Sequence, residues 1–298
     1  MSAAASEKVK RVLSKRFVCL VLRHNRYILD CMKPISKTAF YCCGVRMQDA
    51  ERAKPVCGDT YAKVFMNEQG LQILETFKDE TRPNISNVAR HRLIDDLLRE
   101  ELIANPNLTV VIIGAGFDTR AFRLQGGTWI ELDEPQVITY KNERLPAANS
   151  ENELQRISID FATDSLEQKL AGYAGRSPVT IVIEGVLMYL EEAVIGKLLE
   201  TLHRLFPRHK LICDLGTREF LDKTAGSIHE KLTRMGATFK FTIDNPEELF
   251  LKNGYRQLET IPIIEKAVLF EAGEIPPEVW QTVQPTLPQG YSIHVFEK

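Results

Sequence analysis

The sequence predicts an α/β protein: a Rossmann-like domain with a parallel sheet, a helical N-terminal cap and a late helical insertion. After about residue 100, short apolar runs rich in β-branched residues alternate with helical patterns. The residues before them have mainly helical spacing, and a glycine pair, Gly114 and Gly116, ends the first apolar run. We therefore assign the cap to residues 1–90, the Rossmann-like domain to 91–298 and the insertion to about 216–244.

Two segments of the cap carry apolar residues at helical spacing, "ISKTAFYCCGVRMQDAER" and "NVARHRLIDDLLREEL". Basic residues crowd the start of the chain, among valines and leucines: Lys8, Lys10, Arg11, Lys15 and Arg16. This pattern is typical of an amphipathic helix with a solvated face, and a membrane-surface or partner helix is the alternative.

Five apolar runs predict the strands of a sheet covered on both faces: "TVVIIGAG", "TWIELDEP", "QRISIDF", "VTIVIEGV" and "HKLICDLG". Helical patterns separate most of them, at residues 135–145, 164–172 and 191–206. Beyond the insertion, "NPEELFLKNGY" predicts a helix with Asn245 as its N-cap, and "RQLETIPII" and "YSIHVFEK" a closing pair of strands.

Composition excludes several classes of protein. The 298 residues are 44% hydrophobic and 26% charged with a net charge of -2, so no overall field attracts nucleic acid. No stretch is apolar for the ~18 residues of a membrane span, and the run "FVCLVL" is too short for a signal peptide. The six cysteines lack metal-site spacing, so we expect reduced thiols, no metal and a cytoplasmic location. The sequence gives no oligomeric state.

The glycine turn predicts a nucleotide site. Glycines between a strand and a helix let a ligand approach the backbone, and the helix start offers free N–H groups. Thr119 stands where a dinucleotide fingerprint has its third glycine. A tight turn without a ligand is the structural alternative.

Acidic residues end the next three strands. Asp133 lies about twenty residues past Gly114, where an acid accepts hydrogen bonds from ribose hydroxyls, and Glu131 is its rival. Asp160 and Glu184 end the following two strands. An acid-lined crevice suits an adenosine with a cationic sulfonium better than a pyrophosphate, which the acids would repel.

"GAGFDTRAFRL", "ELDEP", "SIDF" and "EGVLMYL" together resemble the leucine carboxyl methyltransferase superfamily, which includes tetracenomycin-type polyketide O-methyltransferases. "KTAFYCCGVRMQDAER" and "VARHRLIDDLL" resemble upstream elements of the same family, so the resemblance covers roughly residues 35 to 215. It implies a class I methyltransferase with a seven-stranded, mostly parallel sheet and S-adenosyl-L-methionine as cofactor.

The resemblance implies a role for each matching residue. The implied cofactor contacts are Lys37 and Arg90 (or Arg92) with the methionine carboxylate, Gly114 with the methionine portion, Asp133 with the ribose, Asp160 and Phe161 with the adenine, and Glu184 with the ammonium. Tyr189 matches a substrate-side tyrosine. In the leucine carboxyl branch an arginine grips the substrate carboxylate where this chain has Ala162, and loss of that bidentate grip disfavours a protein tail as substrate.

We therefore expect an O-methyltransferase acting on a small molecule with a hydroxyl or carboxyl group. The expected acceptor is neutral and partly aromatic, because the cap and insertion supply an apolar set: Phe40, Tyr41, Phe220, Met235, Phe239 and Phe241. The sequence identifies no catalytic base, and Tyr189 and His229 are the candidates. A protein carboxyl methyltransferase, a nicotinamide oxidoreductase and a non-catalytic nucleoside-binding protein are the alternatives.

Overall fold

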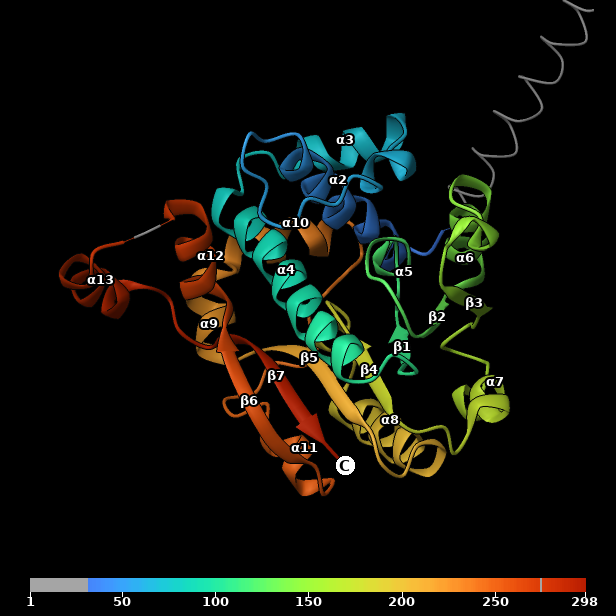
Figure 1. The fold of residues 1–298 in the computed structure, drawn as a ribbon. Coiled ribbons are helices and arrows are strands. Elements are labelled where there is room, and N and C mark those ends of the chain that lie inside the picture. Colours follow the sequence, from blue (N-terminus) through green and yellow to red (C-terminus); the bar gives the residue numbers. More distant parts are fainter. Residues whose placement is uncertain (1–31, 274) are drawn as a thin grey trace, which may run out of the picture.

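The computed structural model describes residues 32–273 and 275–298, and Figure 1 shows helices arranged around a central sheet. The strands are β1 (Thr109–Ile113), β2 (Thr128–Asp133), β3 (Glu153–Ser158), β4 (Val179–Ile183), β5 (Lys210–Gly216), β6 (Arg256–Pro262) and β7 (Tyr291–Glu297). Their order is β3-β2-β1-β4-β5-β7-β6. Strands β1 to β5 pair in parallel, and β7 is antiparallel to β5 and β6. The predicted seven-stranded, mostly parallel sheet is confirmed.

The side chains of the central strands point alternately to the two faces of the sheet and so form two hydrophobic cores. Every residue of β1 and of β4 is buried. Val111 and Ile113 pack into the core on one face, and Val110 and Ile112 pack into the core on the other. Because successive side chains of a strand point to opposite faces, a continuous apolar run buries both sides.

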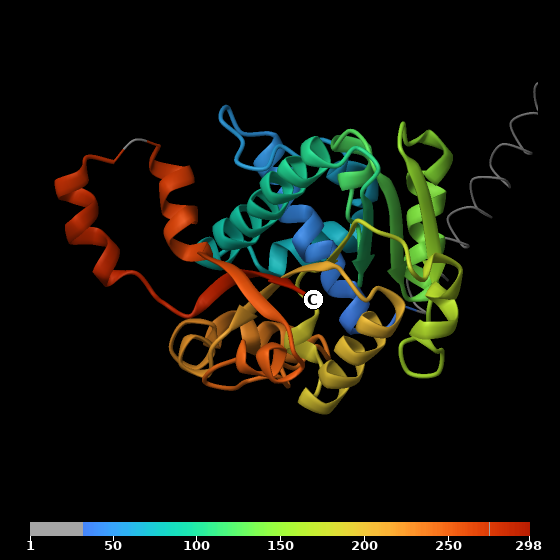
Figure 2. The ribbon, with the colours of Figure 1, turned by 60° about the horizontal axis from the view of Figure 1, so that its bottom comes forward.

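The helices complete the two outer layers. The α-helices are α2 (Thr38–Ala50), α3 (Glu68–Thr76), α4 (Thr81–Ala104), α5 (Arg120–Arg123), α6 (Pro135–Arg144), α7 (Leu166–Leu170), α8 (Glu192–Leu205), α9 (Arg218–Thr224), α10 (Gly226–Arg234), α11 (Glu248–Lys252), α12 (Ile263–Ala272) and α13 (Pro277–Val283). Short 3-10 turns are η1 (Ile35–Lys37), η2 (Ala62–Phe65), η3 (Ala147–Asn149), η4 (Ala171–Tyr173), η5 (Leu187–Tyr189) and η6 (Gln284–Thr286). Helices α4 and α8 pack on opposite faces of the sheet (Figure 2).

The cap packs through aromatic rings. Phe40 of α2 lies edge-on to Phe117, with ring centroids 4.8 Å apart, and Tyr140 of α6 lies 5.6 Å from Phe40. Helix α4 continues from the cap onto the sheet, so the predicted boundary at residue 90 falls inside one helix. The division into cap and domain stays a prediction, and the basic segment 8–16 lies outside the described residues.

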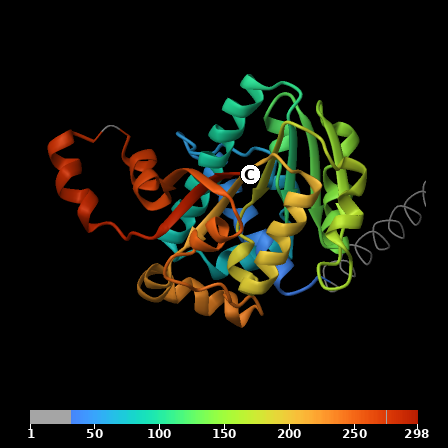
Figure 3. The same ribbon diagram turned by 90° about the horizontal axis from the view of Figure 1, so that it is seen from below.

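The region after β5 differs in part from the sequence prediction. Helices α9 and α10 form in the expected insertion. Asn245 was predicted to cap the next helix, but α11 begins three residues later, with Glu247 at its N-cap. The sequence did not predict α12 and α13, which lie between β6 and β7. Strand β6 ends at Pro262, and Ile263 and Ile264 begin α12 instead of extending the strand. Helix α13 stands away from the body of the molecule in Figure 3 and has no buried residue.

Candidate functional site

The glycine turn is held to the end of β2. Gly114 and Gly116 have φ angles of 70° and 45°, and a Cβ on Gly114 would lie 2.5 Å from a methyl carbon of Val186. Asp133 accepts hydrogen bonds from the backbone N–H groups of Gly116 at 2.6 Å and Glu134 at 2.7 Å. Positive φ and close packing together explain why glycine is needed at the first position.

Asp133 retains capacity for a ligand. Its side chain is almost fully buried, and burial raises its pKa to about 6 despite the two N–H donors. A carboxylate has about four acceptor positions, so two remain for hydroxyl groups. Its rival Glu131 is fully buried and pairs with Lys141 at 2.7 Å and Arg156 at 2.9 Å.

A lysine that the sequence analysis missed joins the ends of β2 and β3. Lys33 Nζ lies 2.8 Å from a carboxylate oxygen of Glu134 and 2.8 Å from one of Asp160. The hydrogen bond from Lys33 is the main cause that lowers the pKa of Asp160. Asp160 and Phe161 are partly exposed beside this bridge. The two residues expected to meet an adenine therefore lie at the protein surface beside Lys33, which no sequence motif marked.

Arg90 connects two parts of the site. Its Nε donates to Glu184 at 3.0 Å, and its Nη1 donates to Asp214 at 3.1 Å and to the Tyr291 hydroxyl at 2.8 Å. Its Nη2 would be 3.1 Å from a Cβ at Gly185, so this edge of the guanidinium covers the turn after β4. The fallback Arg92 instead pairs with Asp96 at 2.7 Å, and Lys37 makes no ion pair with the described residues.

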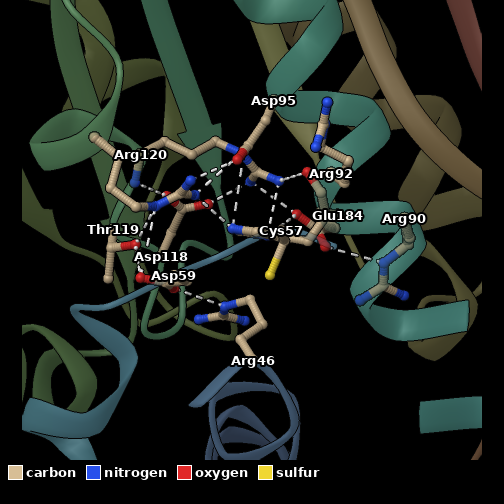
Figure 4. A network of polar contacts seen from close by, with 12 residues as sticks. Arg46, Cys57, Asp59, Arg90, Arg92, Asp95, Asp118, Thr119, Arg120 and Glu184 are labelled. Atoms are coloured by element: carbon tan, nitrogen blue, oxygen red, sulfur yellow. Dashed lines mark hydrogen bonds and ion pairs between the residues drawn. The ribbon is translucent and has the colours of Figure 1, made fainter. Parts of the chain in front are cut away.

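A buried network of charges supports Glu184 (Figure 4). Arg120 is fully buried and contacts Asp95 at 2.6 Å, Asp118 at 2.5 Å and Glu184 at 2.8 Å. Burial raises the pKa of Glu184, but Arg120, His91 and Arg90 outweigh it and hold the pKa well below its usual range. The "GFDTR" segment therefore contributes Asp118 and Arg120 to a buried charge network beneath Glu184, which we call the floor of the site. The sequence pattern did not predict this network.

The floor also gathers three groups of metal-binding type. One ligand atom each of His91, Asp118 and Glu184 lies within 4.8 Å of the others. Guanidinium nitrogens of Arg120 and Arg123 lie 2.8 Å and 2.7 Å from the two ring nitrogens of His91. The arginines thus already balance the negative charge of this cluster. The four cysteines among the described residues are free thiols.

A cavity of about 640 Å³ adjoins the site. Arg90 and Gly185, which belong to the site described above, also line this cavity. The rest of its wall comes mainly from α2, α4, α9, α10, α12 and the segment after α13. Four residues of the predicted acceptor lining belong to it: Tyr41, Phe220, Phe239 and Phe241. Phe40 does not, because it is fully buried in the aromatic cluster of the cap, and Met235 is likewise absent from the wall.

The two candidate bases occupy different positions. Tyr189 lies on the cavity wall, and burial raises its pKa, so it keeps its proton at neutral pH. His229 is absent from the wall: its ring stacks on Phe239 with centroids 4.5 Å apart, and its Nε2 faces the backbone N–H of Phe239 at 3.3 Å. Neither geometry is that of a general base, and both assignments stay predictions.

Comparison with known proteins gives consistent matches. The leucine carboxyl methyltransferase family matches residues 39–203. A protein of Mycobacteroides abscessus is 29% identical over 62% of this chain and 67% of its own length. One of Mycobacterium sp. strain KMS is 28% identical over 57% of this chain and 63% of its own. Both carry the name "Putative S-adenosyl-L-methionine-dependent methyltransferase". The matched region thus spans about two thirds of these relatives.

A solved structure shares the fold. A duf574 family protein of Streptomyces avermitilis aligns with a TM-score of 0.55 at 12% identity, covering 85% of this chain and 99% of that one. In the part of the chain that the structure describes, every helix is too short or too polar to cross a bilayer.

Proposed function

The chain belongs to the leucine carboxyl methyltransferase family, and from this premise we propose that it transfers a methyl group from S-adenosyl-L-methionine to an oxygen of a small molecule. The observation that best supports this proposal is the cavity lined in part by Arg90 and Gly185, because its wall is mostly apolar and aromatic. A cavity of this volume and lining is typical of small-molecule sites. The cavity reaches Gly185, next to the Val186 that faces Gly114, which supports an acceptor within reach of a cofactor on the glycine turn.

The residues at the strand ends fit the cofactor. The glycine turn leaves no side chain between the backbone and a ligand, and Asp133 keeps acceptor positions for ribose hydroxyls. We propose Asp160 with Phe161 for the adenine, and Lys37 with Arg90 for the methionine carboxylate. We propose that Glu184 binds the ammonium group of the cofactor, because its lowered pKa keeps the carboxylate charged.

The cofactor supplies a methyl group already activated on a sulfonium, so the chain mainly positions the acceptor and excludes water. A carboxylate acceptor is ionised at neutral pH and needs no base. Tyr189 keeps its proton, so we propose that it donates a hydrogen bond that orients the acceptor oxygen. Helices α9 and α10 form part of the cavity wall and, on this proposal, act as the lid over the acceptor.

Radiolabelled methyl transfer tests the proposal. The protein is incubated with labelled S-adenosyl-L-methionine and two substrate classes side by side: hydroxylated aromatic compounds and a protein phosphatase C-terminal peptide. We expect label in the aromatic class and none in the peptide, because Ala162 offers no guanidinium for a terminal carboxylate. Efficient labelling of the peptide would establish the protein carboxyl methyltransferase alternative instead.

A further inference from the structure

The cavity wall carries one guanidinium without an acidic partner among the described residues. Arg82, in the first turn of α4, is exposed and lines the cavity. Its backbone carbonyl accepts a hydrogen bond from Ser86, but its side chain makes no ion pair within residues 32–273 and 275–298. An unpaired cation on an otherwise apolar wall is a recognition element for an anion.

The other charges on the wall are balanced. Arg90 pairs with Asp214 at 3.1 Å, and Glu271 is bound by both guanidinium nitrogens of Arg52. Glu80, which precedes α4 and is absent from the wall, is held by Lys231 at 2.7 Å. Arg82 therefore leaves the cavity with one uncompensated positive charge.

The position of this charge sets the length of a ligand. Arg82 and Arg90 lie eight residues apart on α4, which corresponds to ~12 Å along a helix axis. Ser86 and Asn87 of α4 also line the cavity, but they already donate hydrogen bonds to Arg82 O and Cys42 Sγ. Most other side chains of the wall are apolar, among them Phe220, Ile228, Leu232, Phe239, Phe241 and Val268. An anionic group buried among them would be unpaired and costly. The wall thus favours an anion at the Arg82 end, where water also reaches.

We propose that the methyl acceptor is an amphipathic anion, whose apolar body lies along α4 and whose carboxylate-, sulfonate- or sulfate-type group pairs with Arg82. The reacting oxygen then lies at the Arg90 end, a detail that rests on the proposed function. The anion site itself does not depend on methyl transfer. The sequence analysis expected a neutral acceptor, and Arg82 is the residue that changes this expectation.

Two fluorescent probes test the anion site. 8-Anilinonaphthalene-1-sulfonate and N-phenyl-1-naphthylamine have the same rings, and only the first carries a sulfonate. We expect Arg82→Gln to raise the Kd of the sulfonate probe about three- to fivefold, the range of a partly exposed ion pair, and to leave the neutral probe unchanged. The effect should shrink at high salt, because an exposed pair is screened.

Two further variants make the result specific. Arg208→Gln removes another exposed arginine, between α8 and β5, that is absent from the cavity wall, and should change neither Kd. Val268→Trp fills part of the cavity from α12 and should weaken both probes.

Equal effects of Arg82→Gln on both probes would overturn the proposal. So would a sulfonate probe that fails to bind the wild type, or whose binding Val268→Trp leaves unchanged. Probe binding as expected together with no methyl transfer to any small molecule would count against the proposed function and leave the anion site in place.

Discussion

Asp133 has a structural role at the end of β2, beside the ligand-binding role that we propose for it. Its carboxylate holds two backbone N–H groups of the adjoining turns. Asp133→Ala should weaken binding of S-adenosyl-L-homocysteine by about 1.5–3 kcal/mol, the range for hydrogen bonds to a charged group. Calorimetry measures this loss. The variant should also lose folding stability, because two backbone donors lose their acceptor. A carboxylate that only lined an open crevice would leave the folding stability unaffected.

The pKa of Asp133 gives a pH prediction. Burial raises it from 3.8 to about 6 in the folded protein, so the folded state binds this proton more tightly than the unfolded state. The contribution of this carboxyl to stability is therefore complete below the unfolded value and is lost as pH rises through about 6. Binding of S-adenosyl-L-homocysteine should show the opposite trend and strengthen through the same range, because the carboxylate is the better acceptor.

Calorimetry from pH 5 to 7.5 checks this trend, with Asp133→Asn as the matched variant without a titrating group. The pKa values of Asp160 and Glu184 are lowered, so neither should titrate in this range. A pH dependence that survives in Asp133→Asn would assign it to another group.

Arg120 gives a prediction about stability. It is fully buried among Asp95, Asp118 and Glu184. Arg120→Met should lower the free energy of unfolding by about 3–5 kcal/mol, because it leaves the buried Asp118 without an ion-pair partner and removes one of the arginines from Asp95 and from Glu184. Urea unfolding measures the loss. Arg204→Gln is the control, since that arginine is 53% exposed beside Glu167, outside the network, and its pair contributes little. Similar losses in both variants would contradict the role assigned to the network.

At the scale of elements, the turn between β1 and α5 is the most demanding local structure. Gly114→Ala should abolish binding of S-adenosyl-L-homocysteine in calorimetry, because the new Cβ meets Val186 and the φ of 70° is unfavourable for alanine. The double variant Gly114→Ala/Val186→Ala relieves the contact but not the backbone strain. It should recover binding only in part, and full recovery would show that the φ angle is unimportant.

The elements that the sequence predicted are those with a strong local pattern. Strands β1 and β4 are continuous β-branched runs, and α4 has sustained helical spacing. Helix α12 was missed because "IPII" extends a strand pattern, while Pro262 ends β6 before it. Periodicity alone does not separate a short apolar strand from the start of a buried helix.

The residues of the candidate site were likewise predictable only where a local sequence feature marks them. Glycines and strand-end acids are local features, so Gly114, Asp133, Asp160 and Glu184 could be singled out from sequence. Lys33, Asp214 and Tyr291 could not, because their roles depend on segments far apart in the chain: Lys33 reaches Asp160 across 127 residues, and Tyr291 meets Arg90 across 201.

For the whole molecule, cofactor choice predicts a thermal response. A ligand that binds only the folded state at 100 times its Kd adds about 2.7 kcal/mol of stability. S-Adenosyl-L-homocysteine should raise the Tm by several degrees, and NAD should leave it unchanged, because acids at the strand ends repel a diphosphate. Differential scanning calorimetry with both ligands decides between them. A shift with NAD alone would favour the oxidoreductase alternative.

If Arg90 holds the cofactor as proposed, its contacts with both halves of the site have a thermodynamic consequence. One side of its guanidinium is fixed by Glu184, and another by Asp214 and Tyr291 on the cavity wall. An acceptor that draws Tyr291 away would reorient the same guanidinium that we propose for the methionine carboxylate. Linkage then requires that acceptor and cofactor change each other's affinity by one common factor. Saturation with either ligand would then shift the affinity for the other by that factor, so that the occupancy of each site would depend on both concentrations.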